Sequence, residues 1–165
     1  MSDYSTTTEA LYQGDYFPEL GIHPETIPCF LTTAFTMKGF QEVQETYQKK
    51  GYTYIRTRNP NRTALGEVLS CLEGGEASLI FSSGMGAITS TLLAILDPGD
   101  HIICNANIYG ETFSVMTQIL KKCNVDVTLV DYQNTEDIAR ALRPNTRLIY
   151  SEVFSNPTLT LVDLR

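Results

Sequence analysis

Short apolar runs alternate with helical stretches over the second half of the chain. Four runs have the length of buried strands, and they lie at 77–81, 101–104, 126–130 and 147–152. The stretches between them predict helices at 87–96, 109–122 and 135–142, the last with Thr135 as its cap. Strands that alternate with helices pair in parallel, because parallel strands need a crossover connection. The pattern therefore predicts an α/β fold with a mostly parallel sheet.

The first part of the chain has a different character. Residues 1–38 show no sustained periodicity of hydrophobic positions, although 32–36 has the pattern of an extended segment. A short helix is expected over 39–50, followed by a loop or extended piece over 51–56. The stretch before the first helix therefore predicts an arm that needs another surface to lie on.

A longer helix is expected to start at Asn59 and Pro60. Asn is a good N-cap, and Pro suits the first helical turn because its missing N–H would have no partner there. Four apolar residues then follow at helical spacing, namely Leu65, Val68, Leu69 and Leu72. Gly74 and Gly75 are expected to end this helix.

Composition excludes several classes of protein. The chain has 165 residues, 42% of them hydrophobic, which is enough for one packed domain. No apolar run is long enough to span a membrane, and the N-terminus has no secretion-signal pattern. A net charge of −7 disfavours a nucleic-acid binder. Four scattered cysteines and two histidines disfavour a disulfide scaffold or a zinc site, so we expect reduced thiols and a cytoplasmic location.

The segment Ser82–Ser83–Gly84–Met85–Gly86 lies between a predicted strand and a predicted helix. Backbone N–H groups and the helix dipole point to one spot there, which suits a phosphate. A close-packed turn explains the same residues equally well. A dinucleotide fold would also require an acid about twenty residues later to hold a ribose. Cys104 and Asn105 stand at that distance, so the dinucleotide interpretation is disfavoured.

Three further segments carry candidate chemistry. Arg56, Arg58 and Arg62 cluster beside Tyr54, and guanidinium and hydroxyl donors can grip a phosphate, although a solvated loop is an alternative. Tyr109 follows a predicted strand, where an aromatic side chain can either cover a flat ring or simply pack. The pair Asn156–Pro157 also follows a strand, where such a pair is most often a turn.

The order and type of these motifs resemble the Cys/Met-metabolism family of pyridoxal-phosphate (PLP) enzymes. That family includes cystathionine γ-synthase, cystathionine γ-lyase, methionine γ-lyase and O-acetylhomoserine sulfhydrylase. The resemblance covers nearly the whole chain from residue 32. Its motifs are Tyr-x-Arg-x-x-Asn-Pro at 54–60, Leu-Glu-Gly-Gly-Glu-Ala at 72–77, Ser-Ser-Gly-Met-Gly-Ala-Ile at 82–88, Pro-Gly-Asp at 98–100, Tyr-Gly at 109–110 and Glu-x-x-x-Asn-Pro at 152–157.

The resemblance implies a fold-type I, aspartate-aminotransferase-like enzyme. Residues 1–58 would form an N-terminal arm that contacts a neighbouring subunit, and 59–165 the first part of the large PLP-binding domain. The subunits would form a dimer that shares its active sites, and a homotetramer beyond it. The activity implied is γ-elimination or γ-replacement on sulfur-containing or O-acylated homoserine-type amino acids. The alternative is a non-catalytic fragment or paralogue that only pairs with a family partner.

The resemblance also implies roles for individual residues. The cofactor phosphate would be held by Ser83 and by the backbone amides of Gly84 and Met85. Tyr109 would stack on the pyridine ring and assist proton movement. Asn156 would lie beside the ring hydroxyl and the substrate carboxylate, with Glu152 as a supporting residue behind it.

Other parts of the implied site come from elsewhere. Tyr54 and Arg56 would reach the phosphate of a neighbouring subunit, with Tyr54 also near the substrate. The family's Schiff-base lysine, its aspartate partner of the pyridine nitrogen and its carboxylate-binding arginine are expected in a C-terminal part beyond residue 165. None of the five lysines in this chain stands in the family's lysine motif.

Two residues depart from the family pattern. Asn61 follows Asn-Pro where the family usually has Thr, a change expected to affect capping more than chemistry. Glu111 stands where methionine γ-lyases typically carry cysteine, which makes a strict methionine γ-lyase a weaker expectation. Its carboxylate either favours a substrate with a distal positive charge or serves only as an acidic residue opening a helix.

Overall fold

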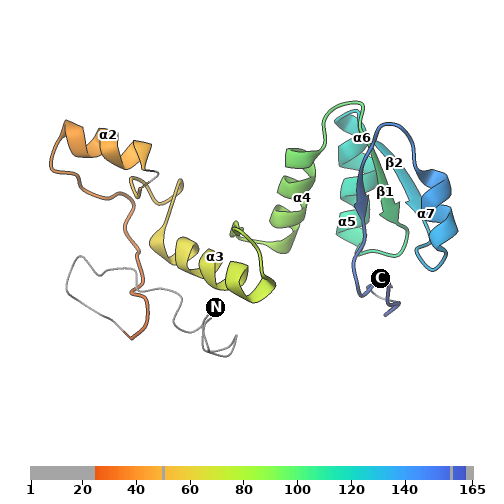
Figure 1. Ribbon diagram of the computed structural model, residues 1–165, viewed down its shortest axis with the longest axis horizontal. Helices are drawn as coiled ribbons and strands as arrows, with labels where there is room; N and C mark the ends of the chain where they lie inside the picture. The colour runs from red at the N-terminus through yellow and green to blue at the C-terminus, as the bar shows by residue number, and fades with distance from the viewer. Residues whose placement is uncertain (1–24, 50, 157, 163–165) are drawn as a thin grey trace. The chain divides into compact units, whose positions relative to one another are not determined.

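The computed structural model describes residues 25–49, 51–156 and 158–162. By their internal contacts the residues fall into two compact units, Met1–Ile80 and Phe81–Arg165. Figure 1 shows both units and labels most of their helices and strands. Residues 1–24 of the predicted arm lie outside the described residues. The predicted division into an arm and a cofactor domain after residue 58 stays a prediction.

The described part of the first unit contains two helices and a short extended pairing. Helix α2, Phe40–Gln48, confirms the helix expected over 39–50. The segment around Ala34 is extended and pairs with Tyr54 in an isolated antiparallel bridge. The Ile55 N–H donates to the Thr33 carbonyl at 2.9 Å in the same pairing. This bridge ties the extended segment to the loop that carries the Tyr-x-Arg motif.

Helix α3, Pro60–Glu73, begins and ends as its sequence predicts. The Asn59 side chain accepts hydrogen bonds from the N–H groups of Asn61 and Arg62, at 2.9 and 3.2 Å. Pro60 occupies the first helical position. Gly74 closes the helix with a φ of 63°, a left-handed conformation that glycine adopts without steric cost.

The strand expected over 77–81 does not form, so that prediction is wrong. This segment packs instead against α3: the hydroxyls of Ser70 and Ser78 lie 2.8 Å apart. Gly66 permits the close approach, because a Cβ there would meet the Ser78 carbonyl oxygen at 3.1 Å. An apolar run becomes a strand only where another strand pairs with it, and in the described residues none lies beside this one.

The second unit is built on a parallel sheet of three strands, β1 (His101–Asn105), β2 (Asp126–Val130) and β3 (Thr146–Tyr150). The order is β2-β1-β3, and β1 pairs in parallel with both neighbours. The register places Cys104 beside Leu129 on one side and Tyr150 on the other. The parallel pairing expected from the alternating pattern is confirmed.

The helices of this unit agree with prediction in number and differ at their ends. Helix α4 spans Gly84–Ile95 and so begins three residues before the expected start. The helix expected over 109–122 is one run of three parts, α5 (Gly110–Ser114), a π-helical turn η2 (Val115–Ile119) and α6 (Leu120–Lys122).

Helix α7, Thr135–Ala141, is capped by Asn134 and not by Thr135 as predicted. The Asn134 side chain accepts from the Glu136 N–H at 3.2 Å. Asn134 has the extended backbone of a cap, with a φ of −120°, whereas Thr135 is already the first helical residue.

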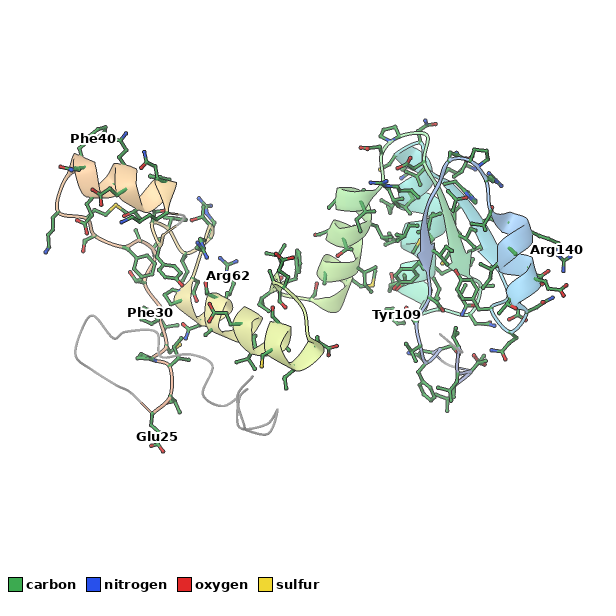
Figure 2. All side chains as sticks on the ribbon, viewed as in Figure 1. Glu25, Phe30, Phe40, Arg62, Tyr109 and Arg140 are labelled. Carbon is green, nitrogen blue, oxygen red and sulfur yellow. The ribbon has the colours of Figure 1, made fainter. Side chains whose placement is uncertain are left out.

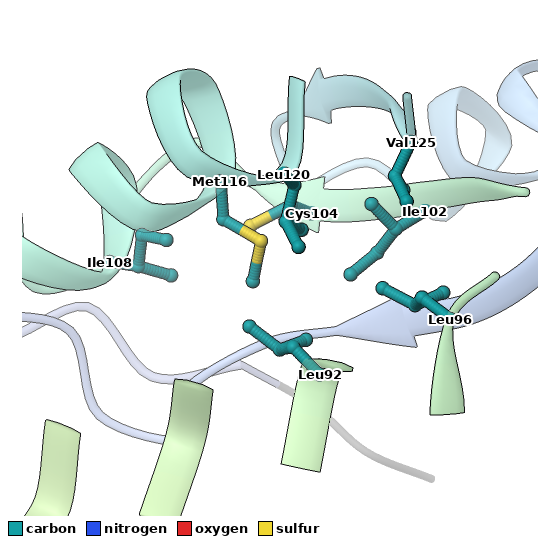
Figure 3. Close-up of a cluster of buried hydrophobic side chains, with 8 residues drawn as sticks. All are labelled: Leu92, Leu96, Ile102, Cys104, Ile108, Met116, Leu120 and Val125. Atoms are coloured by element: carbon teal, nitrogen blue, oxygen red, sulfur yellow. The ribbon is translucent and has the colours of Figure 1, made fainter. Parts of the chain in front are cut away.

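Alternate residues of β1 face the two sides of the sheet. Ile102 and Cys104 pack with Leu92 of α4 and with Met116 and Leu120 of the π-turn and α6 (Figure 3). Ile103 faces the other side with Tyr132, against residues of α7. β1 is buried along its whole length, so the core of this unit lies on both faces of its central strand.

The outer strand β3 is less well covered. Ile149 points to the α7 side of the sheet and is 50% exposed, because α7 packs over β2 and β1. Val153 and Phe154, which follow the strand, are also more than half exposed. In the described part of the chain no helix is long and apolar enough to cross a membrane.

At the amino end of the sheet a buried histidine joins all three strands. His101 of β1 is fully buried, with Nδ1 2.8 Å from the Thr146 hydroxyl of β3 and Nε2 2.8 Å from the Thr128 hydroxyl of β2. Arg143 donates to both hydroxyls, at 2.7 Å from its backbone N–H and 3.0 Å from Nη2, and pairs with Asp126 at 3.4 Å. Burial first, and then Arg143, lowers the pKa of His101, while Asp126 opposes the shift.

This lowered pKa predicts a stability that falls with acidification. The unfolded histidine takes up its proton near its ordinary pKa of about 6.5, while the folded one stays neutral to lower pH. The free energy of unfolding should therefore decrease as the pH falls from about 6.5 to the folded pKa, then stop changing on this account. Urea denaturation across this range measures the slope. His101→Gln should flatten this slope, because the titrating group is then absent from both states; a slope that His101→Gln leaves unchanged would contradict the prediction.

Candidate functional site

Parallel pairing brings the carboxyl ends of β1 and β3 together, at Asn105 and Tyr150. In open α/β sheets ligands bind in the crevice beyond these ends. The loops that follow β1 and β3 carry Tyr109 and Asn156, two of the residues singled out from the sequence.

The start of α4 presents two free donors. The Ser83 hydroxyl oxygen accepts from the Gly86 N–H at 3.0 Å and so occupies the third N–H group of the helix. The N–H groups of Gly84 and Met85, first and second in the helix, have no acceptor among the described residues. Free N–H groups and the positive end of the helix dipole form an anion site.

Space at this turn favours the same conclusion. A Cβ added to Gly84 would meet nothing within 4 Å, so this backbone is open to a ligand. A Cβ at Gly86 would come within 3.0 Å of the Ser83 hydroxyl, so Gly86 is needed for the capping contact. The two glycines therefore have different roles: Gly84 leaves room for an anion, and Gly86 permits the capping contact with Ser83.

Tyr109 lies at the N-cap position of α5 with its side chain 43% exposed (labelled in Figure 2). Its own side chain caps nothing, and its backbone N–H donates to Glu152 Oε2 at 3.0 Å. Glu111 lies in the first turn of the same helix, as its helix-opening interpretation predicts, and no described residue forms an ion pair with it.

A hydrogen-bonded chain links the strand ends, and sequence reasoning missed it. The Asn105 side chain donates to the Ser151 hydroxyl at 3.0 Å and accepts from the Asn107 N–H at 3.1 Å. The Ser151 hydroxyl donates in turn to the Glu152 carbonyl at 3.2 Å. The available signal was the position of Asn105, a polar residue directly after the apolar run 102–104.

Beneath Tyr109, the buried Thr112 connects α5 to its surroundings. Its hydroxyl donates to the Met85 sulfur at 3.8 Å and also bonds with Tyr150. Burial first, and then the Glu152 carboxylate, raises the pKa of Tyr150 and raises that of Cys104 to about 12. Both groups are therefore neutral at physiological pH, and Glu152 is the carboxylate whose field reaches the strand ends.

Asn156 lies at the exposed tip of a turn, and its side chain bonds to no described residue. Buried Ser155 holds the turn, accepting from the Thr160 N–H at 2.9 Å and lying 2.7 Å from the Thr158 hydroxyl. Leu159 adopts a φ of 56°, unusual for a branched residue. Asn156 lies in a turn as expected, whereas Pro157 is outside the described residues. Asn156 forms no hydrogen bond with Glu152, whose carboxylate accepts from Tyr109.

Tyr54 and Arg56 belong to the first unit, where they lie together. The Arg56 guanidinium carbon is 4.7 Å from the centre of the Tyr54 ring, a cation–π arrangement. Arg58 stacks similarly on Tyr52, at 5.6 Å. Arg62, labelled in Figure 2, donates to the carbonyls of Ile55 and Arg56 and so braces the loop. Arg56 is exposed and forms no ion pair with a described residue, so its donors are open to a ligand.

One hollow of about 680 Å³ lies in the first unit, between α3 and the segment 76–80. Arg58 and Arg62 of the predicted arginine cluster contribute to its charged lining together with Glu67 and Glu76, whereas none of the residues that the family resemblance assigns to the active site takes part. The described residues contain no cluster of three or more His, Cys, Asp or Glu side chains suited to a metal.

Comparison with curated proteins finds lyases of sulfur amino acids. An L-methionine gamma-lyase of Treponema denticola is 38% identical over 139 residues, 83% of this chain and 35% of the relative. A cystathionine gamma-lyase of Bacillus subtilis is 44% identical over 71% of the chain and 31% of the relative. A cystathionine beta-lyase of the same organism is 36% identical over 100% of the chain and 41% of the relative. The chain thus spans about a third to two fifths of the length of these relatives.

Solved structures agree with this result. The metB protein of Corynebacterium glutamicum matches with a TM-score of 0.86 and 31% identity, over 98% of this chain and 40% of its own. A Campylobacter jejuni protein assigned as an O-acetylhomoserine (thiol)-lyase, which carries a pyridoxyl-lysine, matches with a TM-score of 0.86, 25% identity and the same coverage. The fold is the first part of the fold-type I PLP architecture, as predicted.

The sequence profile of the Cys/Met metabolism PLP-dependent enzymes matches residues 8–165. With relatives above 30% identity over most of the chain, this match confirms the resemblance drawn from the motifs. The chain belongs to the Cys/Met metabolism family of PLP-dependent enzymes.

Proposed function

We propose that residues 1–165 are the N-terminal portion of an enzyme that carries out PLP-dependent γ-elimination or γ-replacement on sulfur-containing or O-acylated homoserine-type amino acids. The observation that carries this proposal is the pair of unbonded N–H groups at Gly84 and Met85, beside the strand ends that hold Tyr109.

The residues at the start of α4 fit the cofactor's phosphate. Gly84 and Met85 offer two N–H donors at the positive end of a twelve-residue helix, and Gly84 leaves room for the anion. Ser83 holds this end of the helix in shape through its contact with the Gly86 N–H. The phosphate would therefore be bound mainly by backbone and dipole, which suits a chain with a net charge of −7.

When bound, PLP supplies an electron sink for the negative charge that forms at the substrate's α-carbon. Tyr109, exposed and fixed at the head of α5, would stack on the pyridine ring and would move a proton through its hydroxyl oxygen. Asn156, exposed on its turn, donates or accepts hydrogen bonds at the ring hydroxyl and the substrate carboxylate.

Tyr54 and Arg56 serve the active site of a neighbouring subunit. Their side chains lie together, with the Arg56 guanidinium over the Tyr54 ring, and both carry donors that suit a phosphate. The enzyme is then a dimer with shared sites and, beyond it, a homotetramer. A cytoplasmic location accords with the four free cysteines.

Replacing Gly84 tests the phosphate site. Gly84→Ala should weaken PLP binding by about ten- to a hundredfold, because a methyl group would enter the space of the anion. It should not lower thermal stability, since a Cβ there meets no protein atom within 4 Å. Gly39→Ala is the matched control, also a residue at a helix start with open space around it. Equal PLP affinity in the two variants, measured by fluorescence titration, would contradict the assignment.

Mixed dimers test the shared site. Arg56→Ala should cost about 1.5–3 kcal/mol of phosphate binding, because a charge-assisted bidentate contact is lost. The second parent is the enzyme with its Schiff-base lysine replaced. If sites are shared, a hybrid dimer holds one site with both lesions and one with neither, so activity should reappear on mixing. Inactive hybrids, with subunit exchange verified by mass, would mean that Arg56 serves its own subunit.

Product analysis of the complete enzyme tests the reaction itself. Cystathionine cleaved at the γ-carbon gives cysteine, 2-oxobutyrate and ammonia, whereas cleavage at the β-carbon gives homocysteine, pyruvate and ammonia. We expect one of three results: the first set of products, methanethiol, 2-oxobutyrate and ammonia from methionine, or replacement of the acetoxy group of O-acetylhomoserine by a thiol with release of acetate. Homocysteine and pyruvate would instead indicate a β-lyase, and no turnover of any of these substrates would favour the non-catalytic alternative.

In the same assay Tyr109→Phe should keep PLP affinity near normal, because the ring remains. Its rate should fall by about 10²–10⁴-fold, the usual effect of losing a proton-transfer group. Turnover is measured per folded, PLP-loaded molecule. A variant as active as the original would leave the Tyr109 hydroxyl outside the reaction.

A further inference from the structure

The start of α5 lacks the capping residues that its own sequence should supply. Tyr109 occupies the N-cap, where Ser, Thr, Asp or Asn is usual, and its side chain makes no capping bond. Thr112 stands at the third helical position, where a capping box has Glu or Gln reaching back to the N-cap N–H. Thr112 is fully buried and bonds elsewhere, to Met85 and Tyr150. Nothing local can satisfy the Tyr109 N–H.

The acceptor comes from another strand, 43 residues along the chain. Glu152, two residues past β3, places Oε2 3.0 Å from the Tyr109 nitrogen. It does across the sheet what the Glu of a capping box does within one helix. Its negative charge also lies at the positive end of the helical run that continues through η2 and α6.

Glu152 is itself held in place. The Ser151 hydroxyl donates to the Glu152 carbonyl, and the buried Asn105 side chain at the end of β1 donates to Ser151. We call this chain of hydrogen bonds, Asn105–Ser151–Glu152–Tyr109, the clamp. It runs from the end of β1 through the segment after β3 to the head of α5. It fixes the residue whose ring and hydroxyl the proposed reaction uses.

We propose that Glu152 is a positioning residue that sets the location of the Tyr109 ring by binding the Tyr109 backbone N–H. This inference rests on the proposed function of Tyr109, and it departs from the expectation that Glu152 supports Asn156. The side chain of Glu152 acts as an acceptor throughout and transfers no proton.

The first test uses amide hydrogen exchange of Tyr109 in the cofactor-free enzyme, so that it does not depend on catalysis. Glu152→Ala should speed this exchange by about ten- to a hundredfold, because a bond to a charged acceptor is lost. Glu152→Gln keeps an oxygen acceptor of the same reach and should restore most of the protection. Glu111→Ala, which removes a carboxylate from the first turn of the same helix, should leave the Tyr109 amide unchanged. Unchanged exchange in Glu152→Ala would overturn the proposal.

The second test is a double-mutant cycle on kcat in the PLP-loaded enzyme. If Glu152 acts through Tyr109, Glu152→Ala should lower kcat by about tenfold or more alone, and by no more than about twofold in the Tyr109→Phe background. Glu152→Gln should recover most of the rate. If the fold-losses in kcat of the two single variants instead multiply in the double variant, Glu152 acts independently of Tyr109. That result would assign Glu152 a general structural role and overturn the proposal.

The two tests separate the possible failures. If exchange of the Tyr109 amide speeds up while Tyr109→Phe is fully active, the clamp exists and the proposed role of the Tyr109 hydroxyl fails. If Tyr109→Phe is impaired and the Tyr109 amide is protected equally with and without the Glu152 carboxylate, the proposed function survives and the clamp fails.

Discussion

The pairing of β1 between two parallel neighbours is the constraint on which the second unit depends. Because both ladders run in the same direction, every loop that follows a strand leaves from one edge of the sheet. Residues that are 43 positions apart in sequence, Tyr109 and Glu152, meet there for that reason. At the opposite edge, the two hydrogen bonds of His101 join β1 to β2 and to β3. The sheet is therefore cross-linked by side chains at both edges.

Unsatisfied backbone donors explain much of the chemistry at this edge. Helix α4 satisfies its third N–H through Ser83 and leaves the first two open, which makes an anion site. The helical run that starts at α5 instead has the N–H of its N-cap satisfied by a distant carboxylate, which makes a fixed platform for an aromatic ring. The same shortage of partners at a helix start therefore yields a binding site in one place and a rigid support in the other.

Local chemistry made most of the fold predictable. The Asn59-Pro60 start, the Gly74 end and the bounds of β2 follow from capping preferences and apolar runs, and all are found. The 77–81 strand failed because an apolar run carries no information on whether a partner strand lies beside it. Thr135 failed as a cap because Asn134, a slightly better one, precedes it. Of the site, the Ser83 turn was visible locally, whereas the Asn105–Ser151–Glu152 chain depends on strand register and was not.

The π-helical turn η2 has a consequence for insertions and deletions. In a π-turn the bond runs from residue i to i+5, so this segment holds one residue more than an α-helix would need. Removing one residue from 115–119 would convert the turn to α-helix and leave the flanking parts facing as before. The same loss within α4 would rotate everything after it by about 100°, since each residue of an α-helix turns by that angle. Length variation between the head of α5 and the buried Leu120 should therefore be tolerated best within 115–119, where it leaves the start of α5, with Tyr109, in place.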